Sequence, residues 1–221
     1  SLEFSYFDAD GAQGFKLGPI DFEIRKGETV FVIGGNGSGK STFLKLFTAL
    51  YTPHSGEIAI DGDWLHAADR VQYRNLFSTI FTDFHLFKYL YGVDSSDEKN
   101  IRELLDKMQL SDRCEIVDGT ISDINLSTGQ RKRMALIASL LEDKDLYIFD
   151  EWAADQDPDF RRSFYTELLP KLKAEGKTVL AATHDDHYFQ YADRVIKLDA
   201  GVFEDYVAPA KNAIRSVPNN D

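Results

Sequence analysis

The chain has 221 residues, enough for one large domain, and a formal net charge of −12. This acidity argues against nucleic acid as a partner and against a polybasic membrane-binding patch, since both require a basic face. The single cysteine, Cys114, excludes an internal disulfide and fits a reducing compartment, and no apolar run approaches the roughly 20 residues that span a bilayer.

The first part of the chain predicts several strands around one glycine-rich turn. Residues 2–6, 15–24 and 29–33 are expected to form strands, and the third, "TVFVI", is a short apolar run of the buried type. The glycine-rich "GGNGSGKST" follows this strand directly, and an amphipathic helix follows the turn. "HSGEIAIDGDWL" predicts a hairpin that turns at Asp61–Gly62, and "NLFSTIF" predicts another strand.

Residues 95–142 differ in character and are expected to form a helical insertion. Its first helix has Ser95 or Ser96 as a possible cap, and its second is expected from Thr128 to Leu141. The buried strand "DLYIFDE", a helix near 158–175, and the strands "TVLAAT" and "RVIKLDAG" come next. Strands that alternate with helices predict an α/β fold with a mostly parallel sheet.

The segment "GGNGSGKS" has the spacing G-x-x-x-x-G-K-[ST] of a phosphate-binding loop. Its glycines let successive backbone amides point at phosphate oxygens. In such a loop Lys40 contacts the β- and γ-phosphates of a nucleotide, and the Ser41 hydroxyl ligates Mg²⁺. The expected nucleotide contacts are Gly34, Gly35, Asn36, Gly37, Ser38, Gly39, Lys40, Ser41 and Thr42.

Two carboxylates end the buried strand "LYIFDE". Asp150 is expected to hold Mg²⁺ through its water shell, because magnesium prefers hard oxygen ligands and keeps several waters. Glu151 is expected to polarise the attacking water as a general base. Together with Lys40, these residues predict hydrolysis of a nucleotide bound with Mg²⁺.

The order of these motifs, with "LSTGQ" between them, resembles the ATP-binding cassette (ABC) ATPases, whose usual signature is LSGGQ. The resemblance implies a P-loop core with a mostly parallel sheet, an antiparallel β subdomain and a helical insertion. It implies ATP and Mg²⁺ as ligands, and a head-to-tail homodimer in which each signature closes over the partner's γ-phosphate. The signature residues are Leu126, Ser127, Thr128, Gly129 and Gln130. Thr128 replaces a glycine of the family, a change that leaves the backbone amide available.

The resemblance also implies roles for single residues. Tyr6 falls where the family stacks an aromatic ring on adenine, and Phe4 or Phe7 could serve instead. Asp157 corresponds to the aspartate of the D-loop, the segment that crosses the dimer interface. Trp152, directly after Glu151, belongs either to that interface or to the core.

His184, in "LAATHDD", corresponds to the family's switch histidine and completes a catalytic set with Lys40 and Glu151. The family's metal-sensing glutamine is absent, and "FTDFHLF" places Thr82 or Asp83 at its position. Asp83 is a hard oxygen ligand and is therefore expected to join Ser41 and Asp150 in the metal shell.

The resemblance divides the chain into a core with the β subdomain (1–94 and 143–205), the helical signature subdomain (95–142) and a polar tail (206–221). Longer segments such as "THDDHYFQYADR" resemble bacterial exporters of cyclic peptides, lasso peptides and siderophore precursors. In those exporters, six membrane helices precede the ATPase on one polypeptide at the cytoplasmic face of the inner membrane. Because the chain opens with Ser1, we expect it to be excised from such a protein. A soluble ABC ATPase with a non-transport role is the alternative.

Overall fold

Six strands form the central sheet of the computed structural model, which describes residues 1–7, 10–92 and 97–204. Their order is β12-β11-β3-β10-β9-β6, and neighbouring strands are parallel except for the pair β11–β12. The strands are β3 (Thr29–Ile33), β6 (Phe77–Ile80), β9 (Leu146–Asp150), β10 (Thr178–Ala182), β11 (Arg194–Asp199) and β12 (Val202–Glu204). The predicted α/β fold with a mostly parallel sheet is confirmed.

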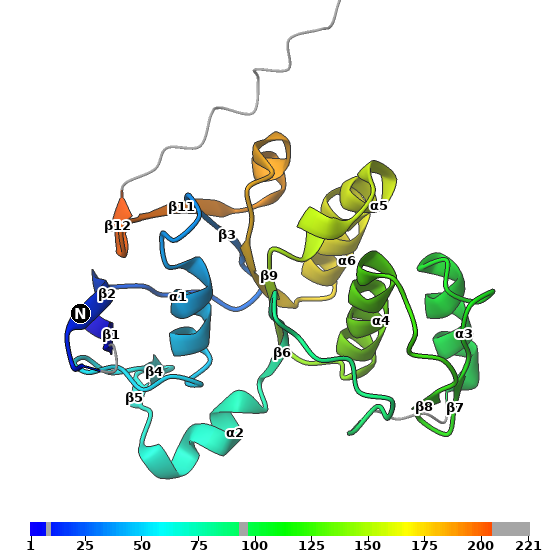
Figure 1. Cartoon of the computed structure of the whole chain (residues 1–221), viewed down its shortest axis with the longest axis horizontal. Helices are drawn as coiled ribbons and strands as arrows, with labels where there is room; N and C mark the ends of the chain where they lie inside the picture. The colour runs from blue at the N-terminus through cyan, green and yellow to red at the C-terminus, as the bar shows by residue number, and fades with distance from the viewer. Residues whose placement is uncertain (8–9, 93–96, 205–221) are drawn as a thin grey trace, which may run out of the picture.

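The central strands are buried on both faces, as their apolar runs predict. Every residue of β3 and β10 is buried, because successive side chains point into two different apolar layers. Val30 faces the layer that contains α1 (Lys40–Phe47), whereas Phe31 faces the layer that contains α4 (Thr128–Leu141) and α6 (Leu169–Ala174). Figure 1 shows these helices on opposite sides of the sheet.

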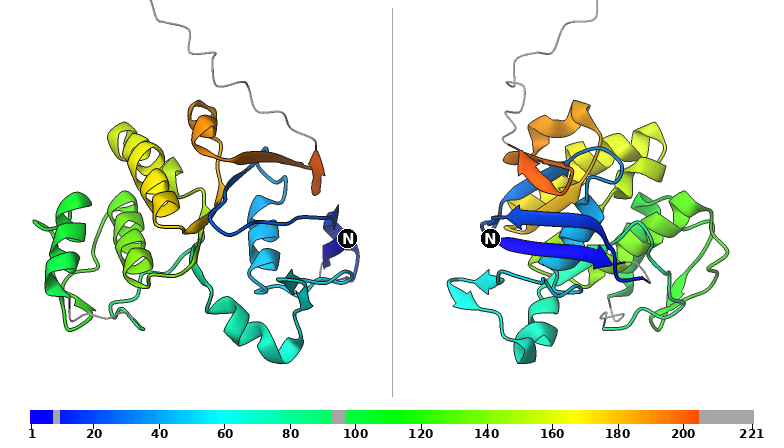
Figure 2. Two further views of the ribbon diagram at one scale, coloured as in Figure 1. Left: turned by 180° about the vertical axis from the view of Figure 1, so that it is seen from behind. Right: turned by 60° about the vertical axis from the view of Figure 1, so that its left-hand side comes forward.

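Antiparallel strands form a separate part of the molecule next to α1. β1 (Leu2–Phe7) pairs with β2 (Gln13–Ile20), and the two lie side by side in blue in the right-hand view of Figure 2. β4 (Ala59–Ile60) and β5 (Asp63–Trp64) form the predicted hairpin, and its turn residues have φ values of 50° and 91°. Two short helices follow, η1 (Ala67–Asp69) and α2 (Arg70–Arg74).

The helical insertion contains α3 (Glu98–Lys107) and α4, which lies within the bounds that the sequence predicts. The expected cap residues Ser95 and Ser96 lie outside the described residues. Asp97 caps α3 instead, because its side chain accepts a hydrogen bond from the amide of Asn100. Between the two helices lies a hairpin that the sequence did not predict, β7 (Ile116–Val117) and β8 (Thr120–Ile121).

The helix expected near 158–175 is present, and a π-helical segment interrupts it. It comprises α5 (Pro158–Ser163), the π-helix η3 (Phe164–Leu168) and α6. Two 3₁₀ helices flank the carboxyl ends of the sheet, η2 (Trp152–Asp155) and η4 (Asp186–Tyr191). The predicted polar tail, 206–221, lies outside the described residues. Among the helices of the described residues, none combines the length and the apolar character needed to cross a membrane.

Candidate nucleotide-binding and catalytic site

The loop between β3 and α1 has the backbone conformation that a phosphate-binding turn requires. Gly34, Gly37 and Gly39 have φ values of 151°, 77° and 107°. A Cβ atom on Gly34 would lie 2.1 Å from the carbonyl oxygen of Leu198, and one on Gly39 would lie 2.7 Å from the ring of Phe15. Gly34 and Gly39 therefore need glycine for both conformation and space. The other predicted nucleotide contacts, Gly35, Asn36, Ser38, Ser41 and Thr42, lie on this loop and on the first turn of α1.

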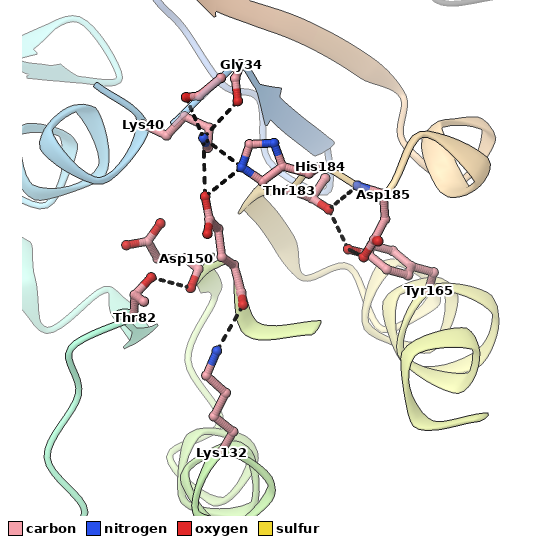
Figure 3. A network of polar contacts seen from close by, with 11 residues as sticks. Gly34, Lys40, Thr82, Lys132, Asp150, Tyr165, Thr183, His184 and Asp185 are labelled. Carbon is pink, nitrogen blue, oxygen red and sulfur yellow. Dashed lines mark hydrogen bonds and ion pairs between the residues drawn. The ribbon is translucent and has the colours of Figure 1, made fainter. Parts of the chain in front are cut away.

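Lys40 lies at the centre of the site, and its side chain is only 5% exposed. Its Nζ donates to the carbonyl oxygens of Gly34 at 2.9 Å and Gly35 at 3.2 Å. It also lies 3.2 Å from Oε1 of Glu151 and 3.1 Å from Nε2 of His184 (Figure 3). His184 Nε2 is in turn 3.0 Å from the same Glu151 oxygen.

The three predicted catalytic residues thus meet at one point, although Lys40 and His184 are 144 positions apart in the chain. Each follows one of three adjacent parallel strands, β3, β9 and β10. The carboxyl ends of parallel strands lie at the same edge of a sheet, which is where ligands bind in open α/β folds. The topology therefore accounts for the convergence.

Glu151 has an unusual backbone, with φ 52° and ψ 35°. A residue with a Cβ atom in this left-handed region costs about 1–3 kcal/mol and persists only where its surroundings fix it. Its amide donates to the carbonyl oxygen of Ala182 at 3.1 Å, and its own carbonyl accepts from Nζ of Lys132 at 3.0 Å. The loop that starts at Glu151, called the catalytic loop below, is therefore held by hydrogen bonds to both β10 and α4.

Asp150 is the strongest candidate for holding a metal ion. Its side chain is buried, and its Oδ1 atom has no hydrogen-bond partner within the described protein. A buried carboxylate oxygen without a donor is costly, so this atom fits the water shell of Mg²⁺. Residues 1–7, 10–92 and 97–204 contain no group of three His, Cys, Asp or Glu side chains that could hold a metal by itself.

The two residues at the position of the family glutamine lie differently. The Thr82 hydroxyl donates to the backbone carbonyl of Asp150 at 3.1 Å, as Figure 3 shows. The Asp83 carboxylate is 74% exposed and lies 3.4 Å from Nζ of Lys45. Thr82 thus contacts β9 directly, whereas Asp83 is exposed to solvent.

Tyr6 on β1 is well placed to stack on a base. Its hydroxyl lies 3.2 Å from Oγ1 of Thr42, one residue beyond the phosphate-binding loop, and its side chain is partly exposed. Phe4 stacks on Tyr51 and on His54, with ring centroids 5.3 and 5.2 Å away. Tyr6 itself makes T-shaped contacts with Phe4 and Tyr51, at 5.1 and 6.1 Å, and it is more exposed than Phe4.

The signature segment begins α4. Ser127 caps the helix: its Oγ accepts from the amide of Gln130, and the Gln130 side chain accepts from the Ser127 amide at 3.0 Å. Ser127 and Thr128 are exposed. No hydrogen bond or ion pair of the described residues joins this segment to the phosphate-binding loop of its own chain. An exposed, capped helix start is suited to binding an anion.

The D-loop lies against the signature of the same chain. The Gln156 side chain donates to the carbonyl oxygen of Gly129 at 3.3 Å, and Asp157 forms an ion pair with Arg133. The Phe160 amide and the Arg133 guanidinium hold the pKa of Asp157 below its usual value.

The sequence did not predict two residues that lie near the site, Tyr165 and Lys132. The Tyr165 hydroxyl lies 2.6 Å from Oγ1 of Thr183 and donates to Asp185 at 2.9 Å, on either side of His184 (Figure 3). Lys132 is buried under Glu151, and its spacing of four residues from the buried Leu136 was the available signal. Trp152 is 2% exposed and stacks on Phe164, so the core interpretation of this residue is confirmed.

A glycine-rich phosphate-binding loop, a buried aspartate and a glutamate–histidine pair at the carboxyl edge of a parallel sheet define a P-loop nucleotide hydrolase. A capped signature helix in a helical insertion narrows this class. The chain belongs to the ABC transporter family, whose family model matches residues 17–154. It is the ATPase domain of an ABC transporter, and domains of this family bind and hydrolyse ATP, generally with Mg²⁺.

Comparison with known proteins supports this assignment. The chain is 48% identical over 205 residues to the ATP-binding protein SyrD of Pseudomonas syringae pv. syringae, which covers 91% of this chain. It is 32% identical over 213 residues, or 90% of the chain, to the ATP-dependent lipid A-core flippase of Vibrio vulnificus (strain YJ016). The chain spans 36% of the length of each of these relatives.

The fold also matches solved structures. The dimeric, ADP- and phosphate-bound structure of the ATP-binding cassette MJ0796 has a TM-score of 0.77 and 26% identity, and the match covers 92% of this chain and 94% of that one. The predicted family and fold are therefore confirmed, and the roles of individual site residues stay predictions.

Proposed function

We propose that this chain hydrolyses MgATP as one half of a head-to-tail homodimer and powers an exporter of a cyclic peptide, a lasso peptide or a siderophore precursor. The observation that carries the proposal is the convergence of Lys40, Glu151 and His184, while the signature helix begins away from them. The contacts from the signature then come from the partner subunit. The dimeric structure of MJ0796 supports this arrangement.

Within one subunit, Lys40 carries the charge that binds phosphate. In the structure its ammonium is shared among two carbonyl oxygens, Glu151 and His184. A γ-phosphate that enters the loop competes for this ammonium through a charge-assisted hydrogen bond. Glu151 is then free to accept a proton from water, and His184 remains within reach of both groups. Ser41 and Asp150 would hold Mg²⁺, which neutralises charge on phosphate oxygens.

The partner subunit supplies the second half of the site through Leu126–Gln130. Two copies that each carry a net charge of −12 repel one another, so we expect a weak dimer without nucleotide. ATP provides an anion for the capped start of α4 and links the two subunits, whereas ADP lacks the γ-phosphate. Dimerisation should therefore require ATP and should end on hydrolysis.

A membrane partner, on the same polypeptide, is part of this proposal. The chain spans 36% of the length of SyrD and of the flippase, which leaves room in those proteins for further domains. Phe87, Tyr89 and Tyr91 expose 59%, 53% and 73% of their surface directly after the Thr82–Asp83 segment. This exposed aromatic row, beside the β7–β8 hairpin, is suited to docking of a transmembrane domain at the cytoplasmic face of the bacterial inner membrane. A soluble ABC ATPase without a membrane partner remains the alternative.

The dimer can be tested by trapping it. Glu151→Gln keeps the shape of the side chain and removes the base, so MgATP should convert this variant into a stable dimer in size exclusion with light scattering. Adding Ser127→Arg should prevent dimerisation, because a long side chain fills the space at the start of α4. Adding Ser111→Arg, at another exposed serine, is the matched control and should leave the dimer intact.

A Glu151→Gln protein that stays monomeric in saturating MgATP would contradict the proposal. If the Ser127→Arg variant still formed the dimer, the signature would not lie at the interface. ATP hydrolysis would remain assigned to the chain, because that assignment rests on its family.

A further inference from the structure

Lys132 carries a charge that is almost fully removed from solvent. Three Asp, Glu, Lys or Arg side chains are buried in the described part of the chain: Lys40, Asp150 and Lys132. The first two belong to the nucleotide site, and Lys132 lies on α4, outside it. Burying an ammonium is costly unless it is paired and hydrogen-bonded, so its partners indicate what it does.

The partners of Lys132 all lie in the loop that carries the catalytic carboxylate. Its Nζ donates to the backbone carbonyl of Glu151 at 3.0 Å and pairs with Oδ2 of Asp155 at 2.8 Å. Its own carbonyl oxygen accepts from the indole N–H of Trp152 at 2.9 Å. Figure 3 shows Lys132 reaching from α4 toward the end of β9. α4 therefore donates a hydrogen bond to the loop and also accepts one from it.

This double contact acts on the one strained peptide of the site. Glu151 has left-handed backbone angles, and its amide and carbonyl are held by different elements, β10 and α4. In this conformation its Oε1 lies 3.2 Å from Nζ of Lys40 and 3.0 Å from Nε2 of His184. If its carbonyl lost the Lys132 ammonium, the backbone would relax toward common angles and the carboxylate would turn away.

We propose that Lys132, together with the Trp152 indole, is a positioning residue that holds Glu151 in the conformation needed to activate water. The inference rests on the proposed role of Glu151 as the general base. Lys132 does not touch the reacting atoms. It acts on the rate through the backbone of its neighbour, and through Asp155 it fixes the start of the D-loop as well.

The test is Lys132→Met, which keeps the length of the buried side chain and removes the ammonium. We expect kcat for ATP hydrolysis to fall about 10- to 100-fold, the effect of misplacing a catalytic group. ATP affinity should change less than about 3-fold, because Lys40 and the phosphate-binding loop are untouched. Lys171→Met, at an exposed lysine paired with Glu175, is the matched control and should leave both quantities unchanged.

A double-mutant cycle separates positioning from a general structural role. If Lys132 acts through Glu151, Lys132→Met should add little further loss in single-turnover hydrolysis once Glu151→Gln is present. Independent, multiplying losses would overturn the inference, as would wild-type kcat in Lys132→Met or a parallel loss of ATP affinity. Trp152→Phe keeps the stacking on Phe164 and removes the indole donor, and it should lower kcat in the same direction.

Trp152→Phe carries the same test if Lys132→Met does not fold, and a wild-type kcat in a folded Trp152→Phe protein would then overturn the inference. The roles of Glu151 and Lys132 can be refuted separately. High activity in Glu151→Gln would refute the role of Glu151 as base. An inactive Glu151→Gln together with a fully active Lys132→Met would refute only the positioning role of Lys132.

Discussion

Asp150 and its neighbour Thr82 leave one buried carboxylate oxygen unpaired at the predicted metal site. Asp150 is enclosed by the sheet, and the Thr82 hydroxyl binds its backbone carbonyl rather than its side chain. The unpaired Oδ1 atom is therefore left for a ligand. Asp83 follows Thr82 in the chain, but its carboxylate is exposed and paired with Lys45. We therefore expect Asp83 to contribute less than Asp150 to the binding of a metal ion.

These positions predict a graded dependence on Mg²⁺. Asp150→Asn removes a buried charge, and we expect the Mg²⁺ concentration for half-maximal ATP hydrolysis to rise about 10-fold or more. Asp83→Ala removes an exposed charge and should raise it about 2- to 5-fold. Titration of Mg²⁺ at saturating ATP measures both. An unchanged Asp83→Ala protein would exclude Asp83 from the metal shell, and a shift in Thr82→Val would assign the role to Thr82.

At the scale of single elements, a helix or strand is predictable when a local sequence pattern covers enough of its residues. Helix α4 and strand β3 lie within their predicted bounds, because a capping box and an apolar run are local signals. The hairpin β7–β8 has strands of two residues, too short to show alternation. The π-helix η3 buries Phe164, Tyr165 and Leu168, so its geometry depends on tertiary packing that no local sequence pattern reports. Likewise, Lys40 was predictable from its motif, whereas the contacts of Lys132 require tertiary structure.

Ser127 has two roles at the start of α4, and substitution can separate them. Ser127→Ala removes the cap, so the free energy of unfolding should fall by about 1 kcal/mol. Ser127→Asp retains a good cap and should restore the lost stability, yet its charge should repel the partner's γ-phosphate and prevent the ATP-dependent dimer. Chemical denaturation and light scattering measure the two effects. Equal instability of both variants would contradict the role of the cap.

At the scale of the whole molecule, two apolar layers enclose the sheet and bury three tyrosines, Tyr147 on β9, Tyr73 on α2 and Tyr165 on η3. Burial, and then the carboxylates of Asp143, Glu175 and Glu142, raise the pKa of Tyr147 to about 12. Burial also raises the pKa values of Tyr73 and Tyr165 well above the usual value. All three phenols are therefore protonated more strongly in the folded chain than in the unfolded chain.

This difference predicts loss of stability in alkali. A folded-state pKa above the unfolded value of about 10 contributes stability that is complete below that pH and is lost as the pH rises through the folded pKa. The free energy of unfolding should therefore fall between about pH 10 and 12. Tyr147→Phe should reduce the slope of this fall, whereas Tyr91→Phe, at a tyrosine that is 73% exposed, should not. Equal slopes in the two variants would contradict the prediction.

The position of β10 in the sheet has a consequence for biosynthesis. β10 lies between β3 and β9, although it is made after both of them. While the ribosome is still adding residues 151–177, the facing edges of β3 and β9 have no strand to pair with, and open apolar strand edges favour aggregation. The catalytic loop also lacks Ala182, which accepts the Glu151 amide. A nascent chain therefore carries a complete phosphate-binding loop well before it can place its glutamate, and the hydrolytic site is assembled only when the central strand β10 is inserted.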